Sequence, residues 1–354
     1  MRILITGNMG YVGPAVVSRL REHRPEATLL GYDLGYFAHC LTGAERLPET
    51  RLDLQIFGDV RSLRQEHLQR VDAVVHLAAI SNDPMGKAYE QVTDEVNHLA
   101  SVRIARLARE QGVGHFIFAS SCSIYGFAEG AARNERSPLN PLTAYARSKI
   151  DTERDVAALA NEDFLVTCLR FPTACGMSPR LRLDLVLNDF MASAIASGRI
   201  DILSDGTPWR PLIDTRDMAR AIDWALGRGR EREGAFLAVN VGRNEWNYQV
   251  RDLAEAVKRC LPQVEISVNP DAPPDRRSYQ VDFTLYRELA GDQWLPQHDL
   301  ADSIASLRHG LEVMGFREVS FRDSQYMRLK VLGRLRESGR LDRELCWRAP
   351  GATS

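Results

Sequence analysis

Lysine is scarce in this sequence. It occurs at only four of 354 positions, Lys87, Lys149, Lys258 and Lys330, although lysine and arginine together number 45. The 47 acidic residues balance them, which leaves a net charge of −2 and a pI near 6.5. Because a balanced charge creates no field that attracts a polyanion, nucleic acid is not expected as a partner. An anionic ligand would instead be held by individual arginines.

Long apolar runs and clustered cysteines are also lacking. The first residues, "MRILITG", enter an apolar run too short for a signal-peptide core, and no uninterrupted stretch is long enough to span a bilayer. We therefore expect a soluble, cytoplasmic protein that does not bind membranes. The cysteines are scattered, without a Cys-x-x-Cys pair or histidines at metal-ligand spacing. Neither a disulfide framework nor a metal site is predicted.

The first half of the sequence alternates apolar runs with segments of helical periodicity. Strands are predicted at residues 3–6, 29–32, 73–77, 115–119 and 164–170, and helices at residues 12–23, 91–111 and 145–160. This alternation predicts an α/β fold in which a Rossmann-like doubly wound parallel sheet carries helices on both faces.

The periodicity becomes less regular after residue 176. We therefore predict a main domain at residues 1–176, rejoined by residues 212–245 through a helix at 214–226 and a strand at 236–241. Residues 177–211 and 246–321 are predicted to form a smaller α/β lobe, with a short strand near Ile202 and turns in "SDGTPWRP". Residues 322–354 form an arginine-rich helical tail, for which a solvated surface helix is expected.

A glycine-rich segment follows the first predicted strand. In "TGNMGYVG", Gly7, Gly10 and Gly13 suit a tight turn, close approach of the backbone to a pyrophosphate, and close helix packing. Asp33 follows Gly13 by twenty residues, at the end of the second strand. Its carboxylate would accept hydrogen bonds from the adenosine ribose and repel a 2′-phosphate, which favours NAD over NADP. A strand, turn and helix without a ligand is the alternative.

The segment "TAYARSK" at residues 143–149 places Tyr145 four positions before Lys149. Residues at this spacing share a helix face, so an exposed aromatic-cation pair is one interpretation. The other is that a compact ammonium, unlike a guanidinium, hydrogen-bonds a ribose while its charge lowers the pKa of the nearby phenol. The second interpretation requires a nucleotide at this place.

Together these motifs resemble those of the extended short-chain dehydrogenase/reductases. The motifs are "GNMGYVG", Asp33, "GDV" at 58–60, "HLAA" at 76–79, "SSCSIYG" at 120–126 and "YARSK" at 145–149, in the family's order. The resemblance runs from Met1 to about residue 290 and is closest to NAD-dependent nucleotide-sugar epimerases and dehydratases, of the UDP-glucose/galactose 4-epimerase type. It implies a NAD-binding Rossmann domain and a substrate-binding lobe.

The resemblance also implies which residues contact NAD. These are Gly7, Met9, Gly10, Tyr11, Val12, Gly13, Asp33, Asp59, Val60, Leu77, Ala78, Ala79, Asn97, Tyr145, Lys149 and Pro172. Most of these contacts would be made by the backbone, and Asn97 would lie in the helix behind the active site.

Three residues have catalytic roles by resemblance. Tyr145 would be the acid/base, Lys149 would bond the nicotinamide ribose and lower the phenol's pKa, and Ser121 would hold the reacting oxygen. A phenol titrates near ~10, so a neighbouring positive charge is needed to form phenolate at neutral pH. Ser123 would assist Ser121. Without a ligand, both serines would simply cap the backbone at the end of a strand.

Departures from the family pattern discriminate among reactions. The 4,6-dehydratases carry an Asp-Glu pair directly after the serine position, where this chain has Cys122 and Ser123, and the glutamate of the sugar-acid decarboxylases is also missing. A catalytic cysteine in related 3,5-epimerases lies two residues before a tyrosine, whereas Cys122 lies three before Tyr125. We therefore expect 4-epimerisation through a transient 4-keto intermediate. A 4-dehydrogenase or 4-ketoreductase and a non-catalytic NAD-sensing scaffold are the alternatives.

The substrate is expected to be a nucleotide sugar whose pyrophosphate is bound by arginine. By resemblance, the substrate-binding residues are Ser121, Ser123, Tyr145, Thr173, Arg180, Arg182, Asn188 and Arg210, together with Arg276 or Arg277. Asp184 is a further candidate for contact with the base or sugar. Any single arginine is equally well explained by a surface salt bridge. Thr173 replaces an asparagine that is usual in the relatives, which leaves the sugar open.

A homodimer is expected as well. Relatives commonly dimerise through the two long helices that correspond here to residues 91–111 and 145–160, with Ile104 and Leu107 available for the interface. The same helical pattern fits burial against the protein's own sheet equally well.

Overall fold

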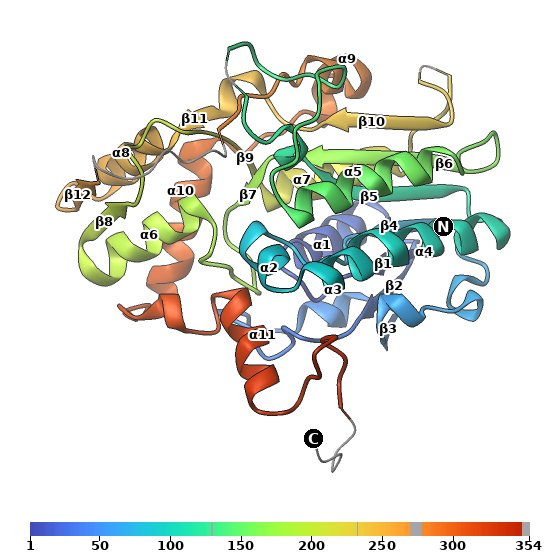
Figure 1. The fold of residues 1–354 in the computed structure, drawn as a ribbon, viewed down its shortest axis with the longest axis horizontal. Coiled ribbons are helices and arrows are strands. Elements are labelled where there is room, and N and C mark those ends of the chain that lie inside the picture. The colour runs from blue at the N-terminus through green and yellow to red at the C-terminus, as the bar shows by residue number, and fades with distance from the viewer. Residues whose placement is uncertain (129, 232, 270–277, 349–354) are drawn as a thin grey trace.

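A computed structural model of the chain describes residues 1–128, 130–231, 233–269 and 278–348 (Figure 1). Its centre is a seven-stranded sheet in the order β10-β6-β5-β4-β1-β2-β3, with every neighbouring pair parallel. The strands are β1 (Arg2–Thr6), β2 (Thr28–Asp33), β3 (Leu54–Phe57), β4 (Ala73–His76), β5 (His115–Ser121), β6 (Leu165–Phe171) and β10 (Phe236–Asn240). The strand order reverses between β1 and β4, which is where ligands bind in such sheets.

Both faces of the sheet are buried because its strands are apolar at consecutive positions. Ile3 and Ile5 pack with α1 (Gly13–His23) and α7 (Thr215–Ala225), while Leu4 packs on the opposite face. That opposite face is covered by α4 (Ala100–Glu110) and α5 (Ala144–Ala157), with the short helices α2 (Asp83–Ala88) and α3 (Glu90–Asp94) beside them (Figure 1). The predicted doubly wound parallel sheet is confirmed.

The helix predicted at residues 91–111 consists of three consecutive pieces. Between α3 and α4 the residues Glu95–Leu99 form a π-helical turn. Inside this turn the carbonyl of Asn97 accepts hydrogen bonds from the side chains of Ser101 (2.6 Å) and Thr152 (2.9 Å). The wider turn accommodates these side chains and carries Asn97 toward the sheet.

The smaller lobe contains two short sheets. One joins β7 (Thr173–Cys175), β9 (Trp209–Asp214) and β11 (Asn247–Gln249), and the other pairs β8 (Arg199–Ile202) with β12 (Glu265–Val268). They pack with α6 (Val186–Ser197), α8 (Val250–Cys260) and α10 (Leu300–Val313), while α9 (Thr284–Ala290) returns to the large sheet. The end of "SDGTPWRP", expected to be a turn, is already strand β9, because residues 209–211 pair with β11.

The C-terminal tail corrects the expectation of a solvated helix. In the described part of the tail the α-helix is Arg328–Glu337 (α11), and the chain then continues to an isolated bridge between Leu341 and Trp347. Five apolar side chains of the tail join the core on the α4 and α5 face of the sheet: Val331, Leu332, Leu335, Leu341 and Leu345. The arginines of the tail suggested a solvated surface, but the apolar side chains between them are buried in the core.

The residues proposed for a dimer interface also need correction. Ile104 is fully buried within the single chain, and Leu107 packs against the same core. Both side chains therefore pack against the protein's own sheet, which was the alternative to a dimer interface.

Among the described residues, no helix is long and apolar enough to cross a membrane.

Candidate active site

A cleft of about 840 Å³ lies at the carboxyl ends of the parallel strands, a volume typical of small-molecule sites. We call the part lined by Gly7, residues 10–13, Asp33 and Asp59 the cofactor end, and the part lined by Ser121, Tyr145, Arg182 and Arg210 the reaction end. Of the residues predicted from sequence, the cleft is lined by Gly7, Gly10, Tyr11, Val12, Gly13, Asp33, Asp59, Val60, Leu77, Ala78, Ala79, Ser121, Ser123, Tyr145, Lys149, Pro172, Thr173, Arg182 and Arg210.

The glycine loop at the cofactor end leaves no room for side chains. Gly7 has φ +74°, and a Cβ on it would lie 2.5 Å from the backbone nitrogen of Ala78. A Cβ on Gly13 would lie 2.0 Å from the carbonyl oxygen of Asn8. Helix α1 begins here without a side-chain cap. Pro14 has no N–H and the amide of Ala15 donates to the carbonyl of Val12 (3.1 Å), so the amide that this helix end offers to an anion is that of Gly13. This arrangement fits the diphosphate of a dinucleotide.

Asp33 joins the glycine loop to the end of β2. Its carboxylate accepts hydrogen bonds from the backbone amides of Met9 (3.0 Å) and Gly35 (2.7 Å). Burial raises the pKa of Asp33, and these two bonds oppose that shift. The carboxylate borders the cleft at the place where a ribose is expected, and its contact with the ribose remains a prediction.

Lys149 is held beneath the reaction end by α5, whose first turn is capped by Thr143. Its ammonium donates to the carbonyl oxygen of Ala119 (2.7 Å) and lies 4.5 Å from the ring centre of Phe118. Burial lowers the pKa of Lys149 to about 8, while the nearby carboxylate of Glu153 opposes that shift. The side chain is only 3% exposed, so the interpretation of an exposed pair does not describe it.

Tyr145 lies one helical turn before Lys149, with its ring centre 5.5 Å from the ammonium. Burial raises the pKa of Tyr145 to about 12, a hydrogen bond with the Ser121 side chain lowers it, and the charge of Asp83 raises it. Formation of phenolate near neutral pH thus needs more positive charge than the protein alone supplies. The lowering of this pKa by Lys149 remains a prediction.

The two serines after β5 differ in what they contact. Ser121 accepts a hydrogen bond from the amide of Ser123 (3.1 Å), which is the backbone-capping role that we considered as an alternative. The Ser123 hydroxyl is buried, lines the cleft, and has no hydrogen-bond partner among the residues that the structure describes. A buried polar atom of this kind is satisfied when a ligand binds. It therefore fits a role in holding a polar substrate.

Asn97 supports the reaction end from behind. Its side chain bonds both backbone groups of Ile80, accepting at 2.7 Å and donating at 3.0 Å, and donates to Ser148 (3.2 Å). Ser148 in turn donates to the carbonyl oxygen of Tyr145 (2.8 Å). Asn97 thus ties the loop after β4 to the helix that carries the tyrosine.

Charged and amide side chains gather at the reaction end. Arg182 donates to Asp184 (2.8 Å) and to the Ser81 hydroxyl (3.0 Å), and the amide of Asn82 donates to Asp184 (2.8 Å). The charge of Arg182 also lowers the pKa of Tyr145, so this cluster lies near the phenol. Such donors and acceptors suit a ligand with many hydroxyl groups.

Some predicted residues do not line the cleft. Arg180 is 1% exposed and pairs with Glu49 (2.7 Å). Asn188 is buried, where its side chain accepts from the amide of Gly176 and donates to Tyr11 and to the carbonyl of Arg182. Met9 contributes its backbone amide to Asp33. The predicted Arg276 and Arg277 lie outside the described residues.

Among the cleft residues that the sequence analysis missed are Asp83, Tyr279 and Arg328. Asp83 accepts from the hydroxyl of Thr143 (2.7 Å) and influences Tyr145. Its position soon after "HLAA" was a signal that could have identified it. Tyr279 and Arg328 reach the cleft from distant parts of the chain, and no local pattern marks them.

Comparisons with known proteins agree with this geometry. Residues 3–242 match the model of the NAD dependent epimerase/dehydratase family. The chain is 23% identical over 320 residues to a UDP-glucose 4-epimerase of Lactobacillus helveticus, covering 86% of this chain and 94% of that one. It is 25% identical over 327 residues to UDP-glucuronic acid decarboxylase 5 of Arabidopsis thaliana, covering 89% and 88%.

Solved structures share the fold. MoeE5 in complex with UDP-glucuronic acid and NAD superposes with a TM-score of 0.75 at 24% identity, covering 88% of this chain and 99% of that one. About a tenth of this chain therefore has no counterpart in MoeE5. The family match extends over the glycine loop, Asp33, Ser121, Tyr145 and Lys149. The chain belongs to the NAD-dependent epimerase/dehydratase family of enzymes, and NAD is its cofactor.

Proposed function

We propose that the protein is a nucleotide-sugar 4-epimerase that acts through a transient 4-keto intermediate. The observation that carries this proposal is the placement of Tyr145 at the reaction end, with Ser121 bonded to it and Lys149 buried beneath. The position after Ser121 holds Cys122, which is fully buried and donates its thiol to the carbonyl of Arg170. Burial raises the pKa of Cys122 well above its usual value, so it does not supply a second acid or base there.

The chemistry follows from these residues. Tyr145, as phenolate, takes the proton of the sugar's C4 hydroxyl while Ser121 holds the same oxygen. NAD, held by the glycine loop and Asp33, would supply the hydride acceptor for C4 and a positive charge near the phenol. Lys149 stabilises the phenolate, and its ammonium is the compact donor for the nicotinamide ribose. The epimer would form when the 4-keto sugar turns its other face toward the cofactor, receives the hydride there and takes the proton back from Tyr145.

The substrate class is supported by the reaction end. A diphosphate needs cationic donors, and Arg210 lines the cleft there. Arg182, Asp184 and the free hydroxyl of Ser123 offer polar groups near Tyr145 for sugar hydroxyls. Two of the relatives are named for UDP-sugar reactions, one an epimerase and one a decarboxylase. A dehydratase or decarboxylase of the family type would need an acid or base where this chain has Cys122 and Ser123.

The test is to incubate the purified protein, without added cofactor, with a panel of nucleotide sugars and to analyse the products by NMR. A C4 epimer without net change in NADH absorbance is the expected result, and Tyr145→Phe should abolish it. Turnover that requires added NAD(H) would replace the proposal with a 4-dehydrogenase or 4-ketoreductase. Loss of water or carbon dioxide would contradict it, and NAD binding without any product would favour the scaffold.

A further inference from the structure

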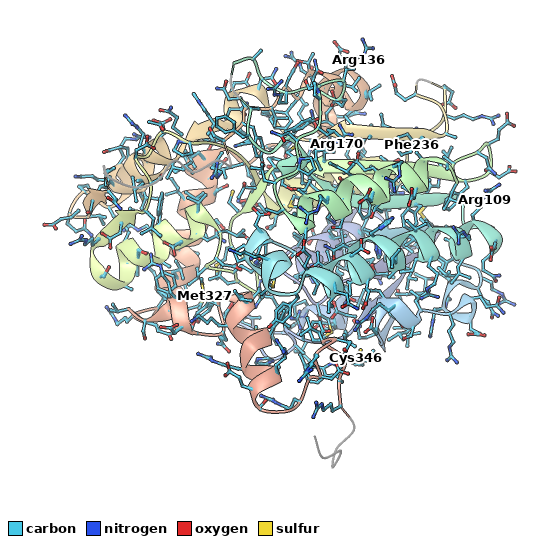
Figure 2. The ribbon with its side chains drawn as sticks, in the orientation of Figure 1. Arg109, Arg136, Arg170, Phe236, Met327 and Cys346 are labelled. Atoms are coloured by element: carbon cyan, nitrogen blue, oxygen red, sulfur yellow. The ribbon has the colours of Figure 1, made fainter. Side chains whose placement is uncertain are left out.

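We propose that residues 328–347, the C-terminal strap, close the cofactor end of the cleft and limit the rate at which NAD(H) leaves the protein. This inference rests on NAD being the cofactor and not on the reaction that it serves. In Figure 2 the labels Met327, the residue just before the strap, and Cys346, the residue before its last one, show where the strap lies. Met327 lines the cleft.

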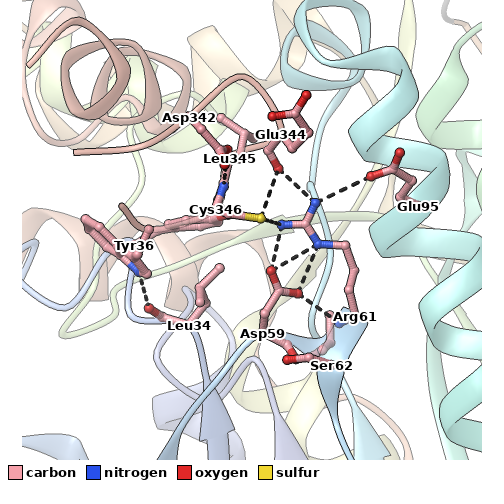
Figure 3. A network of polar contacts seen from close by, with 12 residues as sticks. Leu34, Tyr36, Asp59, Arg61, Ser62, Glu95, Asp342, Glu344, Leu345 and Cys346 are labelled. Carbon is pink, nitrogen blue, oxygen red and sulfur yellow. Dashed lines mark hydrogen bonds and ion pairs between the residues drawn. The ribbon is translucent and has the colours of Figure 1, made fainter. Parts of the chain in front are cut away.

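The strap bonds to the loop that follows Asp33. The indole of Trp347 donates to the carbonyl oxygen of Leu34 (2.7 Å), and the hydroxyl of Tyr36 donates to the carbonyl oxygen of Leu345 (Figure 3). Leu34 and Tyr36 both line the cofactor end. The strap therefore holds in place the wall against which the adenosine half of NAD is expected to bind.

A single guanidinium extends this attachment to the end of β3. Arg61 donates to the carboxylate of Asp59 (2.6 Å), to the carbonyl oxygen of Glu344 (2.8 Å) and to the sulfur of Cys346 (3.0 Å) (Figure 3). Asp59 lines the cleft where contact with adenine is expected. Movement of the strap would remove two of the bonds that hold Arg61 against Asp59.

The strap also reaches the other side of the cleft. Helix α11 contacts α2, which follows β4, and Figure 1 shows the two helices side by side. The guanidinium of Arg336 lies 5.4 Å from the ring centre of Tyr89. Tyr89 and Val92 belong to the same apolar core as Leu332 and Leu335 of the strap. The strap thus spans from the loops after β2 and β3 to the segment after β4. These are the two sides between which a cofactor in this cleft would lie.

The first residue of the strap brings a buried positive charge into the cleft wall. Arg328 is 1% exposed, donates to the carbonyl oxygen of Arg180 (2.8 Å), and lies 4.5 Å from the ring centre of Phe37. No carboxylate in the described ranges lies within ion-pair distance of it, although the charge of Asp184, which pairs with Arg182, acts on it from further away, and burial lowers its pKa to about 10. A buried cation without a direct ion-pair partner is costly, and a phosphate in the cleft would offset that cost.

The tip of the strap is held less firmly than the residues just before it. Leu341 and Leu345 are almost fully buried, whereas Trp347 is 40% exposed, with its side chain against Tyr36 and Leu34 and its backbone bridged to Leu341. Local opening draws on such weakly buried contacts. The distal end can therefore release while the apolar anchors stay packed, which provides an exit for the cofactor without unfolding of the domain.

The test measures cofactor release directly. The protein is loaded with NADH and mixed with excess NAD, and the fall in NADH fluorescence gives the release rate in the absence of any sugar. Trp347→Ala should accelerate release about fivefold to tenfold, the size expected for one hydrogen bond and one ring contact. Removal of residues 340–354 should accelerate it further. Trp294→Ala is the matched control, because Trp294 is partly buried near Arg19 and does not line the cleft.

A second pair of variants tests the role of the buried positive charge of Arg328. Arg328→Met should also speed NADH release, whereas Arg334→Met, on the exposed side of the same helix, should not. Unchanged release in Trp347→Ala and Arg328→Met, with folding intact by circular dichroism, would overturn the proposal even if the truncated chain failed to fold. Weaker binding of a UDP-sugar by Arg328→Met, with NADH release unchanged, would assign this charge to the substrate and overturn its role toward NAD. The assay needs no turnover, so its outcome is independent of the proposed epimerase reaction.

Discussion

The two ends of the cleft are built by different means. At the cofactor end, backbone amides and tight glycine turns at Gly7 and Gly13 form the surface, and the carboxylate of Asp33 is tied to two backbone amides. At the reaction end, the surface is made by charged side chains such as Arg182 and Asp184. Backbone geometry is encoded locally, so it leaves a motif in the sequence. Side-chain clusters depend on which distant segments meet, so they do not.

The largest effect is expected from removing the acid/base of the reaction end while leaving the cofactor end intact. Tyr145→Phe deletes one hydroxyl and should reduce turnover by about a hundredfold to ten-thousandfold. The NADH dissociation constant should change little, because the glycine loop and Asp33 lie at the other end. Fluorescence titration and product analysis on the same preparation measure both quantities. A variant that retains normal turnover would show that Tyr145 is not the acid/base.

The converse experiment alters the cofactor end. Asp33→Asn replaces a carboxylate that accepts two amide hydrogen bonds, so it should weaken NADH binding by about tenfold. It should also reduce the ratio of the affinity for NADH to the affinity for NADPH. Turnover at saturating cofactor should fall much less than in Tyr145→Phe. Asp53→Asn is the control, since Asp53 also accepts from a backbone amide, that of Leu29, but does not line the cleft. Equal affinity of the unaltered protein for NADH and NADPH would contradict the assignment of Asp33.

A smaller effect concerns the burial of Lys149. Burial lowers its pKa to about 8 from the usual 10.5, so above pH 8 the unfolded chain binds a proton that the folded chain does not. In the cofactor-free protein, the free energy of unfolding contributed by this group should therefore rise with pH, by up to about 2 kcal/mol between pH 8 and pH 10. The raised pKa values of Tyr145 and of buried thiols such as Cys122 act in the opposite direction, because the unfolded chain releases these protons toward pH 10 while the folded chain keeps them. The contribution of Lys149 is therefore the difference between the unaltered protein and a variant that lacks this lysine.

Urea unfolding at pH 7, 8, 9 and 10 measures this dependence. The difference in the free energy of unfolding between the unaltered protein and Lys149→Met should grow with pH, while the difference between the unaltered protein and Lys87→Met, at an exposed position, should not. A difference that does not depend on pH in Lys149→Met would contradict the lowered pKa of Lys149. Lys149→Arg is less informative for folding than the sequence suggested, because a bulkier side chain must fit a site that is only 3% exposed.

The difference between features encoded by local spacing and features made by distant segments explains which parts of the structure the sequence could predict. Long strands such as β5 and β6 carry several buried apolar residues in succession, so the hydrophobic pattern identified them. The edge strand β3 is half exposed and β7 and β11 have three residues each, which leaves too little pattern to read. The glycine loop, Asp33 and the Tyr145–Lys149 pair were identifiable because each depends on local spacing.

Residues at the reaction end and in the strap depended on contacts that spacing does not reveal. Arg180 and Arg182 are two positions apart in one loop, yet Arg180 pairs with Glu49 while Arg182 meets Ser81 and Asp184. Arg328 comes from a tail whose arginines suggested a solvated surface, and only the burial of Leu332 and Leu335 brings it inward. In both cases, the partner lies in a segment far away in the sequence.

The smallest effect on chemistry is expected outside the cleft, at the predicted dimer interface. With Ile104 and Leu107 in the protein's own core, the exposed apolar residue of this helical segment is Leu99, which is 53% exposed. The side chain of His98, beside Leu99, bonds that of Asp155 of α5 (2.8 Å), so the two helices proposed for the interface are joined at this point.

If a four-helix interface forms, Leu99→Arg places a charge within it and should shift the mass found by light scattering from dimer to monomer at micromolar concentration. Turnover per chain should stay close to normal, because Leu99 does not line the cleft. Val313→Arg, at a comparably exposed position on α10, should leave the mass unchanged. A monomeric mass for the unaltered protein would rule out the predicted dimer.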